Sequence, residues 1–320
     1  RLDYSTGAEA FLLEPQSTNL MPYSEDFSTW TTSGTANVTS NTSISPDGTL
    51  NASTVSGLNG SGGNDLYVTT SINPANTTYT YSIYLKGSGT IRMQMSNNVD
   101  NAGSRILTLS SSWVRYDLTH TFNATAGSLV VNLDDSGGTA TTYDVWGAMI
   151  ENQSYPTSYI PTSGTTVTRN QETCINATPE INSEEGVLYA EISALADDGA
   201  ARRLSLSDGT NNNRVLIGYN AANTIQFVIQ SLGAISVNQT FTLTDITQFS
   251  KIAFKYKEND CSFWIDGVKV GTDIIAAMPI GLNQALFAQG FTNEPFFGNT
   301  KDLQVYTKAL SDAELIKLTT

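Results

Sequence analysis

The chain has 320 residues, of which 39% are hydrophobic and only 14% charged, and its 16 basic and 30 acidic residues give a formal net charge of −14. The length predicts two domains, because a single hydrophobic core stops growing near about 250 residues. The acidic balance argues against nucleic acid as a partner, since its phosphates require a basic surface. No apolar run is long enough to span a membrane, so no membrane insertion is expected.

The first residues mix apolar side chains with prolines and show no clear period. We expect residues 1–16 to form an N-terminal strap, and the same irregular pattern continues to Trp30. Such a segment is typical of a chain that lies across a sheet edge. A stretch rich in Ser, Thr, Asn and Gly follows as far as Asn64.

Residues 17–168 carry repeated strand signals, in which apolar and polar residues alternate between Gly-rich turns. This pattern predicts half-buried antiparallel strands of a jelly-roll sandwich. In the segment 78–86 the odd-numbered residues form an apolar face, and Ser82, Tyr84 and Lys86 form the opposite face. The strands are predicted at residues 66–69, 78–86, 91–95, 105–109, 113–122, 128–133 and 142–150.

The second predicted domain covers residues 183–320 and follows a linker at residues 169–182. Its strand signals include the meander 251–270 with its Asp266-Gly267 turn. Ser311 and Glu314 have the spacing of a capping box, which predicts one short helix at the end. The expected fold class is therefore all-β, with two antiparallel β-sandwich domains in tandem and one short C-terminal helix.

Cysteine and histidine are too scarce for common catalytic or zinc sites. Cys174 and Cys261 are the only cysteines, and they are compatible with one disulfide or with two thiols, of which we favour unpaired thiols. His120 is the only histidine, and its place between two threonines predicts a solvent-facing strand residue. A catalytic triad would have to use this residue, so we expect no such triad.

Both predicted domains resemble modules of bacteriophage proteins. The first resembles the N-terminal carbohydrate-binding-like jelly roll of phage tail and other virion-associated proteins, through the strings LLEPQSTNL at 12–20, YSEDF at 23–27, WGAMIE at 146–151 and TSYIPT at 157–162. The second resembles a concanavalin A-like, laminin-G-type jelly roll of the same proteins. The strings that carry this second resemblance are EGVLYAE at 185–191, IDGVK at 265–269 and FGNTKDLQVY at 297–306.

These resemblances imply a non-catalytic protein of the virion surface or extracellular space that recognises a host or environmental glycan. The implied partners are a polysaccharide or cell-surface glycan and other virion proteins, with a homotrimer as one oligomer to consider. The same modules often hold structural Ca²⁺. A structural virion spacer is the alternative, and a polysaccharide lyase or glycosidase is a further one, although no spacing singles out a catalytic set.

Sugar binding requires aromatic planes beside planar polar side chains. Tyr84, Lys86, Arg92 and Gln94 fall in phase on two strands that we expect to be neighbours, so they are predicted to line one surface. An ordinary solvated face is the alternative. The pair Arg202 and Arg203 is a candidate counter-charge for an acidic glycan, or it simply flanks a strand. The ligand-binding candidates are Tyr84, Lys86, Arg92, Gln94, Arg202 and Arg203.

Calcium binding requires several oxygen ligands on an ordered edge. Glu25, Asp26 and Asp144 lie where the resembling jelly rolls often hold a structural ion, so they are the predicted metal ligands. Plain solvated carboxylates are the alternative for these three residues.

Overall fold

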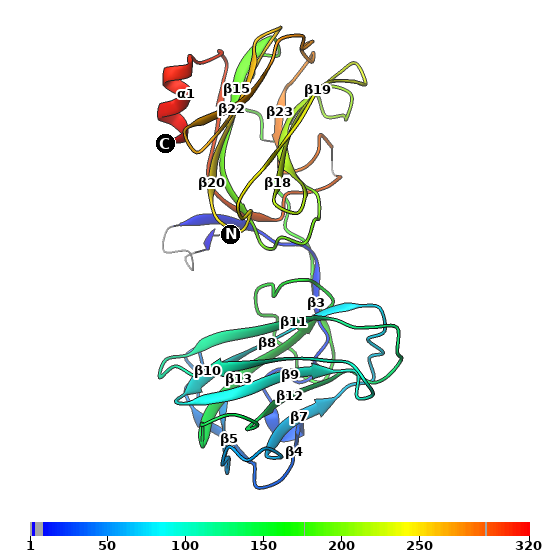
Figure 1. Ribbon diagram of the computed structural model, residues 1–320, viewed down its shortest axis with the longest axis vertical. Coiled ribbons are helices and arrows are strands. Elements are labelled where there is room, and N and C mark those ends of the chain that lie inside the picture. Colours follow the sequence, from blue (N-terminus) through cyan, green and yellow to red (C-terminus); the bar gives the residue numbers. More distant parts are fainter. Residues whose placement is uncertain (1, 4–8, 176, 292) are drawn as a thin grey trace. The chain divides into compact units, whose positions relative to one another are not determined.

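The computed structural model describes residues 2–3, 9–175, 177–291 and 293–320 and consists almost entirely of antiparallel β-sheets (Figure 1). The chain divides into two compact units, which we call the N-terminal sandwich (Gln16–Asn170) and the C-terminal sandwich (Arg1–Pro15 with Gln171–Thr320). Within the described residues the single α-helix is α1 (Asp312–Thr319) at the C-terminus. The prediction of an all-β fold with one short C-terminal helix is confirmed.

The N-terminal sandwich consists of two five-stranded antiparallel sheets. The first, the β9 sheet, has the strand order β10-β9-β12-β7-β4. Its strands are β4 (Thr31–Thr32), β7 (Asp65–Thr69), β9 (Thr90–Ser96), β10 (Ala102–Thr108) and β12 (Val130–Asp134). The second, the β8 sheet, has the order β11-β8-β13-β6-β5. Its strands are β5 (Asn37–Ser43), β6 (Ala52–Ser56), β8 (Thr78–Gly87), β11 (Val114–Thr121) and β13 (Thr142–Glu151).

Shorter elements complete this sandwich. Strand β3 (Ser17–Asn19) pairs with β14 (Val167–Arg169), so the start and the end of the unit lie side by side. The 3-10 helix η1 (Phe27–Thr29) brings Phe27 and Trp30 against the core.

Strands β8 and β9 alternate in the same phase and face each other across the core. Tyr81, Ile83 and Leu85 of β8 are fully buried, as are the odd-numbered residues of β9 from Ile91 to Met95. Only Ser88 and Gly89 connect the two strands, yet the chain passes from one sheet to the other instead of forming a hairpin. Gly89 makes this corner possible, because its φ is +85° and a side chain there would lie 2.8 Å from the Ala140 nitrogen.

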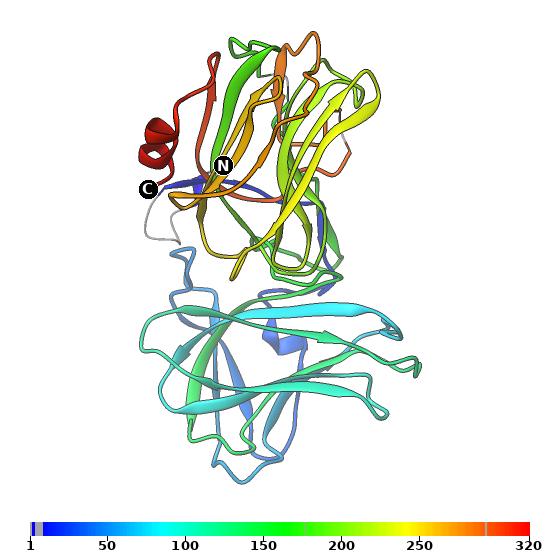
Figure 2. The ribbon, with the colours of Figure 1, turned by 45° about the horizontal axis from the view of Figure 1, so that its top comes forward.

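The C-terminal sandwich pairs a seven-stranded sheet with a five-stranded sheet, which lie face to face (Figure 2). The β20 sheet has the order β1-β2-β24-β15-β20-β21-β22. Its strands are β1 (Leu2–Asp3), β2 (Ala10–Leu13), β15 (Glu185–Ala194), β20 (Ser250–Lys257), β21 (Cys261–Ile265), β22 (Val268–Asp273) and β24 (Gly298–Tyr306). The β17 sheet has the order β19-β18-β17-β16-β23. Its strands are β16 (Arg202–Ser207), β17 (Arg214–Ala221), β18 (Thr224–Ser231), β19 (Ala234–Thr242) and β23 (Gln284–Leu286).

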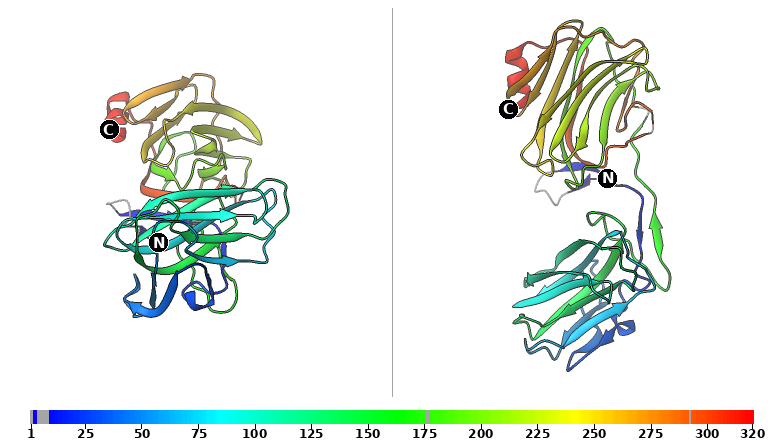
Figure 3. Two further views of the ribbon diagram at one scale, coloured as in Figure 1. Left: turned by 60° about the horizontal axis from the view of Figure 1, so that its bottom comes forward. Right: turned by 45° about the vertical axis from the view of Figure 1, so that its right-hand side comes forward.

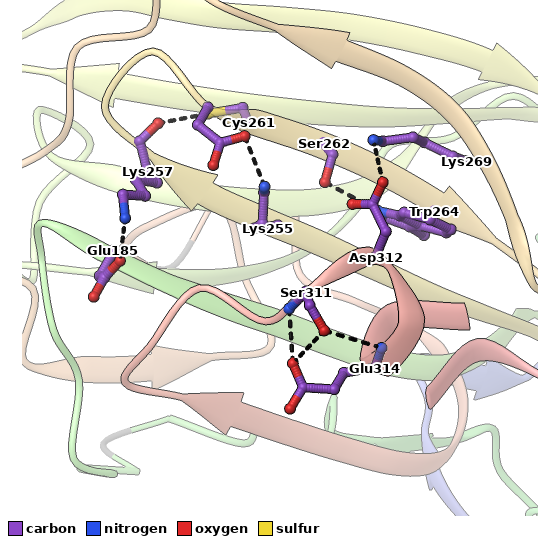
Figure 4. A network of polar contacts seen from close by, with 11 residues as sticks. Glu185, Lys255, Lys257, Cys261, Ser262, Trp264, Lys269, Ser311, Asp312 and Glu314 are labelled. Carbon is purple, nitrogen blue, oxygen red and sulfur yellow. Dashed lines mark hydrogen bonds and ion pairs between the residues drawn. The ribbon is translucent and has the colours of Figure 1, made fainter. Parts of the chain in front are cut away.

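Helix α1 covers the outer face of the β20 sheet. Leu315 is fully buried there in a small cluster with Val187, Tyr189 and Trp264, separate from the main core of this sandwich. The predicted capping box is present, since Ser311 accepts from the Glu314 backbone and the Glu314 side chain accepts from the Ser311 nitrogen at 2.8 Å (Figure 4).

Residues predicted as a strap and a linker take part in the C-terminal sandwich. Strand β2 pairs with β24 and extends the β20 sheet, while residues 1 and 4–8 of the predicted strap lie outside the described residues (Figure 3). In the predicted linker, the Cys174 carbonyl accepts from the Phe287 nitrogen at 3.1 Å, within the same unit. Leu13 of β2 aligns with Gly298 of β24, and its side chain is buried.

Candidate functional site

The outer face of the β9 sheet gathers planar polar side chains and one aromatic ring. Gln94 on β9 aligns with Ser104 on β10 and with Asn132 on β12, and Asn132 aligns with Tyr67 on β7. Neighbouring strands lie about 4.8 Å apart, so this row crosses about 14 Å of the sheet. Arg92 lies on the same face in the adjacent row. We call Tyr67, Arg92, Gln94 and Asn132 the β9 face.

Arg92 is held rigidly by one buried carboxylate. Its Nε donates to both oxygens of Asp134, at 2.8 and 3.0 Å, and the Asp134 side chain is fully buried. The Ser136 nitrogen also donates to Asp134, at 2.8 Å. Asp134 engages only Nε, so both terminal nitrogens of Arg92 lack a hydrogen-bond acceptor among the described residues. The Arg92 side chain is 32% exposed, so its two terminal nitrogens are held in place as hydrogen-bond donors for a ligand.

Asn132 lies between Gln94 and Tyr67, and all three side chains are half-buried. Asn132 Oδ1 finds no hydrogen-bond donor in the described part of the chain. An aromatic ring beside amide side chains suits a sugar, because the ring packs on the apolar C–H face while amides bind hydroxyl groups.

Tyr84 takes no part in this face, so the prediction that it lines one surface with Arg92 is wrong. Strands β8 and β9 belong to different sheets, and their outward residues therefore lie on opposite sides of the sandwich. Tyr84 packs against Trp146, with ring centroids 5.4 Å apart, and against Tyr159 at 6.3 Å. The Arg115 guanidinium lies over its ring at 5.7 Å. These contacts show that Tyr84 packs against other side chains on the outer face of the β8 sheet.

Lys86 also lies on the β8 sheet, where it forms an ion pair with Asp144. Lys86 Nζ is 3.0 Å from Asp144 Oδ2 and 5.2 Å from the Trp113 ring centroid. Burial acts to raise the pKa of Asp144, but hydrogen bonds from Thr54 and Ser43 and the charge of Lys86 hold it below its usual value. The pair lines a hollow of ≈ 340 Å³. We call this second candidate surface the Lys86 hollow.

The three predicted calcium ligands do not converge. Glu25 accepts hydrogen bonds from Asn51 at 3.0 Å and from the Tyr159 hydroxyl at 2.9 Å. Asp26 caps η1 by accepting from the Ser28 nitrogen at 3.1 Å, and Asp144 binds Lys86. Within the described ranges no group of three or more His, Cys, Asp or Glu side chains is placed to hold a metal ion. Glu25, Asp26 and Asp144 therefore do not fit as one ligand set.

Arg202 and Arg203 point to opposite faces of β16, because successive strand residues alternate. Arg202 is buried and pairs with Asp198 at 2.8 Å. Arg203 lies on the outer face of the β17 sheet and pairs with Glu294 at 3.1 Å. The two arginines therefore do not act as a pair on one ligand.

His120 lies partly buried at the edge of the sandwich, so the prediction of a solvent-facing residue is wrong. Its ring is 4.7 Å from the Phe122 ring, and Nε2 is 2.8 Å from Asn101 Oδ1. Burial lowers the pKa of His120. The prediction of unpaired thiols is confirmed, since Cys174 and Cys261 are both free and burial raises the pKa of Cys261 to about 11.

Sequence reasoning missed Tyr67 and Asn132 on the β9 face and Arg214 on the outer face of the β17 sheet. Each occupies an outward position in an alternating strand, which is a signal that the sequence does carry. The sequence does not reveal that β12 lies between β9 and β7, and this strand order is what assembles the face.

Comparison with known proteins supports the fold of the C-terminal sandwich. Residues 188–316 match the family model of the concanavalin A-like lectin/glucanases superfamily. No curated protein sequence matches the chain. The described residues contain no helix with the length and apolar character needed to cross a membrane.

Several solved structures are similar at low identity. The Ruminococcus gnavus IT-sialidase CBM40 has a TM-score of 0.38 and 16% identity, and the match covers 46% of this chain and 98% of that chain. The CBM22-1-CBM22-2 tandem domain from Paenibacillus barcinonensis Xyn10C has a TM-score of 0.34 and 10% identity, with 93% and 100% covered. The bacteriophage CBA120 tailspike protein 4 enzymatically active domain has a TM-score of 0.34 and 13% identity, with 41% and 21% covered.

Proposed function

We propose that this protein binds a glycan through the β9 face of its N-terminal sandwich. The observation that carries the proposal is the alignment of Tyr67, Asn132 and Gln94 on three adjacent strands, with the fixed fork of Arg92 beside them. The lectin-type family match of the C-terminal sandwich supports a role in carbohydrate binding.

The β9 face offers complementary groups to a sugar chain that lies across the strands. The Tyr67 ring packs on the apolar face of one ring, and the amides of Asn132 and Gln94 bind hydroxyl groups further along the row. The terminal nitrogens of Arg92 donate to ring or hydroxyl oxygens. A hydrogen bond to a charged group contributes about 1.5–3 kcal/mol, so Arg92 is the strongest polar contact of the set.

The finer role that we propose is non-catalytic attachment at a virion or cell surface, where the protein meets glycans outside the cell. The phage-module resemblance of residues 12–168 and 183–320 supports this role. Several copies of a weak site bind a repetitive glycan far more tightly than one, so a homotrimer or assembly with other virion proteins would suit it.

A glycan array with the full chain tests the proposal. The expected result is binding of at least one polysaccharide class, with a loss of about tenfold or more for Tyr67→Ala and for Gln94→Ala. Tyr23→Ala is the matched control, because Tyr23 is 41% exposed and lies outside the β9 face. Absence of binding across plant, marine and bacterial glycans, or unchanged binding by both variants, would contradict the proposal.

The Lys86 hollow is the alternative location on the same sandwich. The Lys86–Asp144 pair lines this hollow, and the Trp113 ring, whose centroid is 5.2 Å from Lys86 Nζ, is an aromatic group near it. Lys86→Ala in the same array separates the two surfaces, since the proposal expects this variant to bind like the unmodified protein.

Structural calcium stays a prediction from the resemblance, and it would require ligands other than Glu25, Asp26 and Asp144 as a set. Repeating the array and a thermal unfolding scan with a chelator tests for an ion. A lower unfolding temperature or weaker binding would show that one is bound.

A further inference from the structure

The outer face of the β17 sheet carries a chain of planar polar side chains that starts at Arg203. Arg203 aligns with Gly218 on β17, and Gly218 aligns with Gln226 on β18. Arg203 Nη1 donates to Gln226 Oε1, and the Gln226 amide donates to Asn238 Oδ1 at 2.7 Å. Gly218 permits this reach across a whole strand, because a side chain there would lie 2.8 Å from the Arg203 Cδ atom.

A second guanidinium, that of Arg214, lies on the same outer face. Arg214 is only 7% exposed, and its Nη1 donates to the Asn211 carbonyl at 2.8 Å. Its Nε is buried without a hydrogen-bond acceptor among the described residues. A buried guanidinium with open donors is costly unless an anion balances it.

Glu294 is the carboxylate that pairs with Arg203. Its Oε2 accepts from Arg203 Nε at 3.1 Å, and its side chain is 41% exposed. Glu294 has a φ of +47°, in the left-handed region that is unfavourable for a residue other than glycine. The backbone before it is anchored to β16, since Ser205 donates to the Ala288 carbonyl at 2.7 Å and Ser207 donates to the Gly290 carbonyl at 2.9 Å.

The pKa of Arg214 indicates that too little negative charge lies near its guanidinium. Burial and the nearby charge of Arg203 lower the pKa of Arg214, while Glu294 opposes this shift. Arg203 has Glu294 as its ion-pair partner, whereas Arg214 has no ion-pair partner among the described residues, in a protein whose formal net charge is −14.

We propose that Arg203 and Arg214 form a binding site for the carboxylate of an acidic sugar residue, with Glu294 occupying part of that site when no ligand is bound. The sugar carboxylate displaces Glu294 from Arg203 and supplies the anion that Arg214 lacks. Gln226 and Asn238 then bind hydroxyl groups of the same chain. This site belongs to the C-terminal sandwich, so it does not depend on the β9 face, although it shares the premise that the protein binds glycans.

The test is calorimetric titration of the full chain with oligogalacturonate, oligoglucuronate and a sialylated oligosaccharide, each beside its methyl ester. We expect at least one acid to bind and its ester to bind about tenfold or more weakly. Arg203→Gln and Arg214→Gln should each weaken binding of the acid by a similar factor. Glu294→Gln should strengthen it about threefold or more, because the internal competitor is gone.

The Glu294 variant separates ligand binding from a purely structural role. If the arginines only hold the segment before β24 in place, Glu294→Gln lowers the unfolding temperature and leaves the affinity for the acidic oligosaccharide unchanged or weaker. That result would overturn the proposal, as would equal affinity for acid and ester or no binding of any of the three acids. Tyr67→Ala should leave this affinity unchanged, so failure here is distinguishable from failure of the β9 face.

Discussion

At the scale of single residues, alternation along a strand decides which side chains meet. It was sufficient to predict that Tyr81, Ile83 and Leu85 face the core, and all three are fully buried. It also separates Arg202 from Arg203, although their adjacency in sequence suggested a pair. The partners of a side chain on neighbouring strands depend on strand order, which alternation does not contain.

The pKa of His120, the single histidine, provides a test of whether its ring is buried as the structure shows. Because burial disfavours the imidazolium, we expect the pKa of His120 in the folded protein to lie below 6.5. The stability that neutral His120 contributes is then present above pH 6.5 and is lost as the pH falls through the lowered pKa. NMR titration of the one imidazole signal measures this value, with the urea-unfolded chain as the control. A midpoint at or above that of the unfolded chain would contradict the expectation.

Glu151 is a buried carboxyl with the opposite sign of pH dependence. Burial raises its pKa, although hydrogen bonds from Ser17 and Thr157 partly oppose this effect. The folded protein therefore loses stability as the pH rises through the usual range of a glutamate toward the raised pKa. We expect Glu151→Gln to show a smaller fall in unfolding free energy between pH 4 and pH 7 in urea titrations. An equal fall in both proteins would show that ionisation of Glu151 carries no such cost.

At the scale of elements, strong alternation of apolar and polar residues predicted most central strands, but it did not predict polar strands at the sheet edges. Strand β8 (Thr78–Gly87) was predicted at 78–86, whereas β5 (Asn37–Ser43) was not predicted at all. Most residues of β5 are exposed at the edge of their sheet, so its sequence lacks an apolar face to detect. Pairing with β6 holds this strand in place, and such pairing is a tertiary effect.

The capped helix α1 gives a prediction at this scale. Ser311 accepts from the Glu314 backbone, so Ser311→Ala removes the cap and should destabilise the C-terminal sandwich by about 1 kcal/mol. Ser311→Thr keeps a hydroxyl and serves as the control. Chemical denaturation measures the difference between them, and equal stability of the two variants would mean that the cap contributes nothing.

At the scale of the whole molecule, two separate cores divide the chain, and the N-terminal residues belong to the second of them. Strand β2 pairs with β24, while the N-terminal sandwich begins only at residue 16. The sequence predicted two sandwiches through their strand patterns and family resemblance. It did not predict this return of the N-terminus, because four residues with an apolar pattern do not identify their partner strand.

Removal of residues 1–15 tests this assignment. The deletion exposes the edge of β24 and removes the buried side chain of Leu13, so we expect the unfolding transition of the C-terminal sandwich to move to lower temperature. The transition of the N-terminal sandwich should stay in place. Scanning calorimetry with the fragment 16–170 as a reference separates the two transitions. A shift of the N-terminal transition alone would contradict the assignment.

The central claim is that the β9 face binds a glycan, and NMR mapping of the full chain tests it most directly. Titration with the glycan selected on the array should shift the backbone amide signals of Tyr67, Arg92, Gln94 and Asn132 in a saturable way. Signals beside Lys86 and Asp144 should stay in place. Saturable shifts confined to the Lys86 hollow or to the C-terminal sandwich, with none on the β9 face, would contradict the claim.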